Sequence, residues 1–207
     1  MEAILLPLTY FGNISYFIHL YDTNEVWIDD QEIYLKQTFR NRAQVLAANG
    51  KIDLSVPVLS TKGIEINIDK IKISYDDPWQ LKHWRTIVSA YRSSPFFEEF
   101  EDDVKELIFS KHELLKDLNL EITIKMLELI GKKKKWQLRS EKELPENIRS
   151  LLGYFKPSKM PQSHLDLEPY IQVFNYKYGF TPNLSILDLL FNEGPYALSY
   201  LLNASSK

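Results

Sequence analysis

The 207-residue sequence lacks cysteine altogether. Disulfide bonds, thiolate zinc sites and cysteine nucleophiles are therefore excluded. Glycine is sparse where it would matter, because the turn at residues 8–13 holds a single glycine and meets neither the Rossmann nor the P-loop phosphate-binding fingerprint. Long apolar runs are also missing, and none approaches the length of a bilayer-spanning helix.

The charge and the first residues narrow the class of protein further. The formal net charge is only −3, so a broad nucleic-acid-binding surface is not expected. Residues 1–7 carry neither the basic stretch nor the long apolar stretch of a secretory signal peptide. We therefore expect a cytoplasmic protein that neither spans a membrane nor binds nucleic acid.

Hydrophobic periodicity divides the chain into a β-rich first part and a mainly helical remainder. Apolar and polar residues alternate in several short runs before residue 75, and Asn49-Gly50 is the strongest hairpin signal in the chain. The expected strands cover residues 3–6, 25–30, 44–47, 52–56, 64–73 and 135–140, and the expected helices cover 14–20, 78–93, 96–109, 110–130 and 145–152.

These elements predict an α+β fold. A mixed, largely antiparallel sheet from the N-terminal third would pack against helices from the remainder. The length permits one large domain or two small ones, and no internal repeat is visible. We expect a single domain over residues 1–207, β-rich over 1–75 and mainly helical over 76–207.

The helix expected to begin at Pro78 is the strongest candidate for one wall of a site. Asp77 suits the N-cap position, and Pro78 suits the first helical position because proline lacks the N–H that would be unpaired there. Trp79, His83 and Tyr91 then share one face of the helix, since they follow each other at multiples of four residues.

His83 has three possible roles. It can be a core histidine whose ring nitrogens are satisfied by backbone or carboxylate groups. It can be a general base, because imidazole titrates near neutral pH. A metal ligand is the third possibility, but no second histidine or acid stands at the spacing of a zinc-binding helix, so we expect no metal site.

Polar residues follow the strand expected at 25–30. Asp29 and Asp30 at its end would either face a cleft or cap the next turn. The segment 31–42 has the composition of a functional loop, and Arg40 and Arg42 could bind a phosphate or carboxylate bidentately. The alternative is a solvated basic loop that pairs with the two aspartates.

Two further features suggest charge interactions. A strand, a turn and a helix from residue 14 would place backbone amides at a helix N-terminus, where anions bind readily. Asp188 lies in an apolar helix capped by Asn183 or Ser185, so the carboxylate needs a partner. A cation or His83 is the obvious candidate, and a catalytic acid is the alternative.

Several of these landmarks together resemble one family over nearly the whole chain. The opening motifs are Pro7, Tyr10-Phe11, Tyr16-Phe17, Asp29-Asp30, Phe39-Arg40-Asn41-Arg42 and Val56-Pro57-Val58. The next are Trp79, Lys82-His83, Thr86-Ile87, Ala90-Tyr91 and Pro95-Phe96-Phe97, and the last is the run from Phe180 to Gly194. As a set, these residues resemble the WbqC-like proteins.

The resemblance implies a function in surface-polysaccharide assembly of the O-antigen type. The expected protein is a cytoplasmic transferase that acts on a nucleotide-linked amino sugar, with acyl or aminoacyl transfer as the candidate reaction. No cofactor is required, although acyl-CoA or an acyl-carrier protein could be the donor. His83 would deprotonate the attacking amine, Arg40 and Arg42 would hold a phosphate group, and Asp29 and Asp30 would bind hydroxyls or the amine.

The predicted site follows from these roles. The expected catalytic residues are His83 and Asp30, and the expected substrate-binding residues are Tyr10, Asp29, Lys36, Arg40, Asn41, Arg42, Trp79, Lys82 and Tyr91. A non-catalytic module that binds a nucleotide sugar or a carrier protein would use the same anion site. A structural subunit would instead expose an aromatic patch made of Trp79, Trp84 and Phe96.

Overall fold

The computed structural model describes residues 3–60, 64–131, 134–156 and 167–205. Its main sheet has four strands in the order β5-β2-β1-β6, and every neighbouring pair is parallel. The strands are β1 (Ala3–Pro7), β2 (Val26–Asp29), β5 (Gln137–Leu138) and β6 (Ile148–Ser150). The fold is therefore mixed α/β, and the largely antiparallel main sheet that the sequence predicted is wrong.

Chain connectivity explains the parallel pairing. The helix α1 (Ile14–Asp22) lies between β1 and β2 and carries the chain back to the starting end of the sheet. Strands joined by such a crossover run parallel, whereas a tight turn would make them antiparallel. The outer strands come from beyond residue 136, and β6 replaces the helix that the sequence predicted at 145–152.

The hairpin is separate from the main sheet and is antiparallel, as the sequence predicted. Strands β3 (Arg42–Ala47) and β4 (Gly50–Ser55) pair from Arg42 opposite Ser55 to Ala47 opposite Gly50. The strands expected at 64–73 are wrong, because this part forms isolated bridges around the short 3₁₀ helix η1 (Ile68–Lys70).

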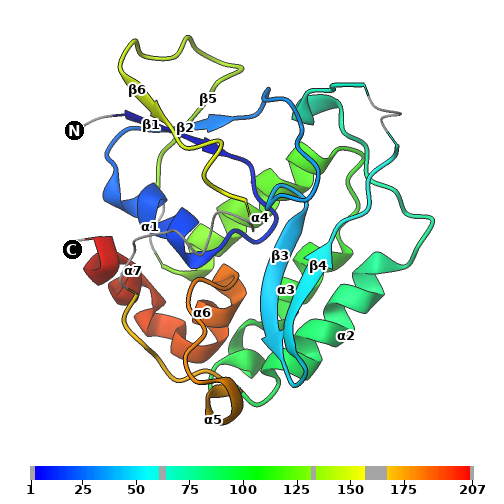
Figure 1. Ribbon diagram of the computed structural model, residues 1–207, viewed down its shortest axis with the longest axis vertical. Helices are drawn as coiled ribbons and strands as arrows, with labels where there is room; N and C mark the ends of the chain where they lie inside the picture. The colour runs from blue at the N-terminus through cyan, green and yellow to red at the C-terminus, as the bar shows by residue number, and fades with distance from the viewer. Residues whose placement is uncertain (1–2, 61–63, 132–133, 157–166, 206–207) are drawn as a thin grey trace.

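The remaining helices pack around these strands (Figure 1). Helix α2 packs against β3 and α3, while α1 lies beside the sheet and packs against α7 and α6. The bounds are α2 (Trp79–Tyr91), α3 (Phe97–Phe109), α4 (Leu115–Leu129), α5 (Asn175–Tyr178), α6 (Ile186–Glu193), η3 (Gly194–Tyr196) and α7 (Ala197–Ser205).

Two predicted helix starts are wrong. Pro78 is the N-cap of α2, without a side-chain cap, and the Asp77 carboxylate instead accepts from Lys82 Nζ at 2.6 Å to both oxygens. Helix α4 starts at Leu115 and not at 110, because the Ser110 hydroxyl donates to the Leu107 carbonyl at the end of α3.

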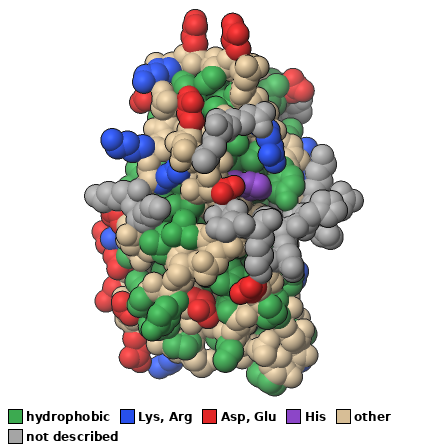
Figure 2. Space-filling view, turned by 90° about the vertical axis from the view of Figure 1, so that its left-hand side faces the viewer, with side chains coloured by type: hydrophobic (Ala, Val, Ile, Leu, Met, Phe, Trp, Pro, Cys, Tyr) green, Lys and Arg blue, Asp and Glu red, His purple; other side chains and the backbone are tan. Residues whose placement is uncertain are grey.

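The hydrophobic core includes residues from β1 through α7. Trp79 is buried, and Trp84 and Phe96 are half-buried against the core, so these residues do not form the exposed aromatic patch that a structural subunit would need. On the side that carries α1 and α7, acidic and basic side chains are interspersed with hydrophobic ones (Figure 2). Within the described residues, no helix has both the length and the apolar character needed to cross a bilayer.

A glycine pair tests the packing around α6. Gly194 has a φ of +49°, and a Cβ there would lie 2.4 Å from the Phe96 ring, whereas Gly131 has a φ of +91° and no atom within 4 Å of a Cβ. Gly131→Ala should cost about 1–2 kcal/mol of unfolding free energy from backbone strain. Gly194→Ala should cost about 1–3 kcal/mol more, because the core is overpacked. Equal losses in urea denaturation would contradict the close contact.

Candidate functional site

A cleft of about 570 Å³ opens at the carboxyl edge of the parallel sheet. Its walls include residues at or beyond the ends of three strands: Asp29 and Glu32 at and after the end of β2, Arg139 after β5, and Leu152 with Gly153 after β6. Because the strands are parallel, these segments meet at one edge. That edge is where open α/β sheets usually bind their ligands.

A second hollow of about 540 Å³ adjoins this cleft. Gln31 and Arg139 line both, and the segment 140–144 completes the second one. Arg139 therefore stands at the junction of two spaces, each large enough for a ring-sized ligand group.

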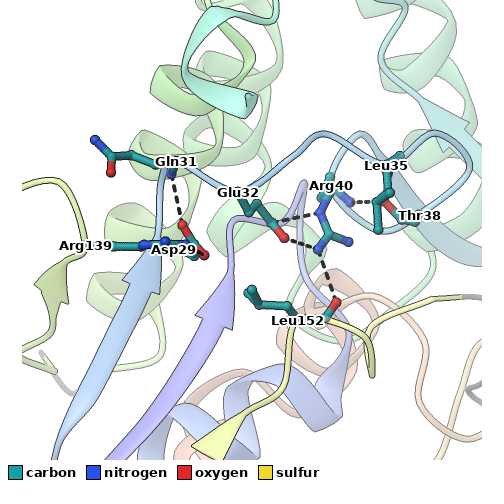
Figure 3. A network of polar contacts seen from close by, with 8 residues as sticks. All are labelled: Asp29, Gln31, Glu32, Leu35, Thr38, Arg40, Arg139 and Leu152. Carbon is teal, nitrogen blue, oxygen red and sulfur yellow. Dashed lines mark hydrogen bonds and ion pairs between the residues drawn. The ribbon is translucent and has the colours of Figure 1, made fainter. Parts of the chain in front are cut away.

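Arg139 is held at this junction by Asp29. Its Nη1 donates to Asp29 Oδ2 at 2.7 Å, and the backbone N–H of Gln31 donates to the other carboxylate oxygen at 3.1 Å (Figure 3). Asp29 is fully buried, but the Arg139 side chain remains 43% exposed. The guanidinium is thus fixed at one end and accessible at the other.

Arg40 and Glu32 form a buried ion pair in the wall of the cleft. Arg40 Nε donates to one Glu32 oxygen at 2.7 Å, and Nη2 donates to the other (Figure 3). Nη2 also donates to the Leu152 carbonyl at 3.1 Å. The two side chains are 0% and 6% exposed, and Arg40 Nη1 has no hydrogen-bond partner in the described part of the chain.

This environment makes Glu32 a titratable group near neutral pH. Burial raises the pKa of Glu32 to about 7, and the hydrogen bonds and charge of Arg40 oppose that rise. A carboxyl with a pKa in this range can accept or release a proton at physiological pH. The sequence analysis did not include Glu32 among its candidates.

His83 lies elsewhere, between α2 and the hairpin. Its Nδ1 is 2.9 Å from the hydroxyl of the fully buried Tyr10, and its ring meets Trp79 edge-on at 5.1 Å between centroids. The ring also forms a hydrogen bond with the Ser55 backbone, and only 5% of His83 is exposed. Tyr10, Trp79 and His83 therefore form one buried cluster, in which Trp79 and His83 come from one face of α2 as the sequence predicted.

Burial lowers the pKa of His83 to about 4, although the hydrogen bond to Ser55 opposes this. The imidazole is thus neutral at pH 7. Arg40 lines the cleft and His83 does not, so these two residues of the predicted site do not share it. A catalytic role for His83 stays a prediction, now without a shared cavity.

The remaining charged candidates lie on the hairpin and the surface. Arg42 on β3 pairs with Asp53 at 2.7 Å, away from the cleft lining. Lys82 pairs with Asp77, and Lys36 is exposed on the loop after β2. The structure therefore does not bring Arg40 and Arg42 together as one clamp.

Three candidates make structural contacts. Asp30 is buried and accepts from the backbone N–H and hydroxyl of Ser140 at 3.0 and 2.5 Å. Asn41 donates to the Val56 carbonyl at 2.8 Å, and the buried Tyr91 ring packs against Phe191. Catalytic or binding roles for these residues stay predictions. Among the described residues, no group of three or more histidine, aspartate or glutamate side chains could hold a metal ion.

Asp188 has neutral partners instead of the predicted cation or His83. Tyr170 Oη and Gln172 Nε2 donate to its Oδ2 at 2.5 and 2.7 Å. Burial raises the pKa of Asp188 to about 6, and these hydrogen bonds oppose the rise. The carboxyl joins the segment before α6 to the helix, and Asp188 is not among the residues that line the cleft.

The anion site expected at the start of α1 is also absent from the described contacts. Asn13 caps the helix through Tyr16 N, while the amides of Ile14 and Ser15 donate to Leu184 and Asn183. The amides are thus used by the protein itself.

Two charged residues of the cleft, Glu32 and Arg139, were not among the sequence candidates. They could have been found from the sequence only by placing both after parallel strands.

The pH dependence of stability tests the burial of His83. Its folded pKa is about 4 and its unfolded value 6.5, so the folded state loses stability as the pH falls between them. At 1.36 kcal/mol per pKa unit this loss is about 3 kcal/mol. His83→Gln should remove it, so the difference in unfolding free energy between variant and wild type should shift by that amount between pH 7 and 4. A difference that does not change with pH would indicate a solvated ring.

Comparison with known proteins gives the family. The model of the WbqC-like protein family matches residues 9–156. The uncharacterised protein Rv1507c of Mycobacterium tuberculosis is 25% identical over 212 residues, which cover 90% of this chain and 91% of that protein. No solved structure shows a significant match. The family match spans more than half of the chain and confirms the resemblance in the sequence. The protein therefore belongs to the WbqC-like protein family.

Proposed function

We propose that the protein is a transferase that acts on a nucleotide-linked amino sugar bound at the carboxyl edge of the parallel sheet. The step would be a cytoplasmic one in surface-polysaccharide assembly. The observation that carries this proposal is the pair of adjoining hollows that meet at Arg139. The hairpin arginine, Arg42, does not take part in it.

The shape of the cleft supports a sugar nucleotide. Such a ligand has two bulky ends, a nucleoside and a sugar, which are joined by a diphosphate. The two hollows of about 570 and 540 Å³ offer one space for each end. The half-exposed Arg139 guanidinium lies between them, where it can donate to phosphate oxygens while it keeps its bond to Asp29.

The charges of the cleft support a sugar that carries an amine. Three acidic residues, Asp29, Glu32 and Glu65, line the same cleft as Arg40 and Arg139. Carboxylates accept from sugar hydroxyls and attract an ammonium group, whereas the arginines donate to anionic oxygens. The group transferred to the amine would be an acyl or aminoacyl group from a thioester donor, either acyl-CoA or an acyl-carrier protein.

A binding module without chemistry is the second candidate. The observation that favours it is the sealed environment of His83, the base that the sequence predicted. Such a module would bind the same ligand through Arg139 and release it unchanged. Turnover of a nucleotide-linked amino sugar with a thioester donor, followed by mass spectrometry, separates the two functions.

A matched pair of arginine variants tests the location of the ligand. Arg139→Gln should weaken binding of UDP-glucosamine at least tenfold in isothermal titration calorimetry, since a hydrogen bond to a charged group contributes about 1.5–3 kcal/mol. Arg42→Gln should leave the dissociation constant within about twofold, because Arg42 pairs with Asp53 outside the cleft. The reverse pattern would place the phosphates on the hairpin and contradict the proposal.

A further inference from the structure

We infer that Glu32 is the group that accepts a proton from the amine of the bound sugar, and that Arg40 positions Glu32 for this transfer. The inference rests on the proposed function, since it needs an amine in the cleft. It assigns proton transfer to a carboxyl group in the cleft of about 570 Å³, where the sugar would lie, instead of to His83, the base expected from the sequence.

The geometry gives the Glu32 carboxylate one fixed orientation. Both of its oxygens accept from Arg40, and Arg40 is itself tied to the Leu152 carbonyl behind β6. The Glu32 side chain is 6% exposed and lines the cleft, so a ligand can reach it without displacing the ion pair. A catalytic group held in this way needs little reorganisation when the ligand binds.

The ion pair leaves one hydrogen-bond donor unused, and this distinguishes it from a purely structural ion pair. Buried charged groups normally satisfy their hydrogen-bond donors, because an unpaired buried donor is costly. Arg40 is fully buried, lines the cleft, and leaves Nη1 without a partner in the described part of the chain. A ligand oxygen that reached Nη1 would supply the acceptor that this buried donor lacks.

The groups around Glu32 favour proton exchange near neutral pH. Burial raises the pKa of Glu32, Asp29 at the end of β2 raises it further, and Arg40 and Arg139 lower it, for a value of about 7. The charge of Glu32 in turn raises the pKa of Tyr16 on α1. An amine beside electron-withdrawing groups, like an α-amino group, has a pKa near 8. The pKa values of the amine, which donates the proton, and of Glu32, which accepts it, are therefore closely matched.

The step moves one proton. The sugar arrives as an ammonium ion, an N–H bond breaks, and an O–H bond forms on Glu32. The amine becomes neutral and regains the lone pair that attacks an acyl carbon. Glu32 becomes a neutral carboxylic acid that still accepts from Arg40. The bound state thus holds one proton, shared between the amine and the carboxylate.

This sharing predicts how binding depends on pH. The dissociation constant of UDP-glucosamine should be lowest between pH 7 and 8, where Glu32 is ionised and the amine is protonated. Binding at pH 6 should be roughly five- to tenfold weaker than at pH 7.5, because most Glu32 is then protonated in the free protein. Calorimetry or fluorescence titration from pH 5.5 to 9 measures the loss of affinity at low pH (the acid limb) and the loss of affinity at high pH (the basic limb).

Variants and a second ligand show which group causes the acid limb and which causes the basic limb. Glu32→Gln should remove the acid limb, while Glu32→Asp should retain an acid limb because it keeps a carboxyl. Glu99→Gln is the control, since Glu99 is an exposed glutamate on α3 outside the cleft lining, and it should leave the profile unchanged. UDP-glucose has a hydroxyl in place of the amine, so its binding should lack the basic limb.

The outcomes separate this inference from the proposed function. A flat wild-type profile between pH 6 and 7.5, or an acid limb that survives Glu32→Gln, would overturn the role of Glu32 while binding itself stands. Failure of both UDP sugars to bind the wild type at any pH would overturn the proposed function, and the role of Glu32 with it. Thermal melts of each variant show whether the fold is intact.

Discussion

The buried ion pair between Glu32 and Arg40 holds together the parts of the chain that form the cleft. Arg40 also donates to the Leu152 carbonyl after β6, and its own carbonyl accepts from Asn119 on α4 at 2.7 Å. The segments after β2 and after β6 are thus joined at the guanidinium of Arg40, and α4 is joined at its backbone carbonyl. Removal of one partner from such a pair costs about 3–5 kcal/mol, because the other charge is left buried and unpaired.

The parallel sheet and the hairpin divide the predicted site between two environments. The sheet edge gathers ionisable groups around accessible space, where Arg139 is half exposed and Glu32 has a raised pKa. The region between α2 and β4 buries His83 against Tyr10 and Trp79 and keeps the imidazole neutral. The first environment suits ligand binding and proton transfer, whereas the second suits packing.

Local sequence signals predicted the parts of the fold that depend on local interactions. Asn49-Gly50 predicted the hairpin, and Ser185 predicted the cap of α6, where its hydroxyl accepts from Leu187 N. Strand direction was not predictable in this way, because a short continuous apolar run such as residues 3–6 fits a parallel strand, a sandwich strand or a buried helix segment. The three residues of β6 are too few to show any periodicity.

The site was predicted only where residues follow a recognisable strand. Asp29 and Arg40 were candidates and do line the cleft. Glu32 was missed because a charged loop residue looks solvated in a sequence, and its burial depends on Arg40 and on the segment at Leu152, which is distant in the chain. The burial of His83 was not predictable, because an aromatic helix face has the same pattern in a core as in a site.

A crystal structure of the protein with UDP-glucosamine tests the central claim most directly. The account predicts the diphosphate against Arg139, with the nucleoside and the sugar in the two hollows on either side and the amine within hydrogen-bonding distance of Glu32. A ligand bound against Arg42 on the hairpin, or in contact with His83 after α2 has moved, would contradict it.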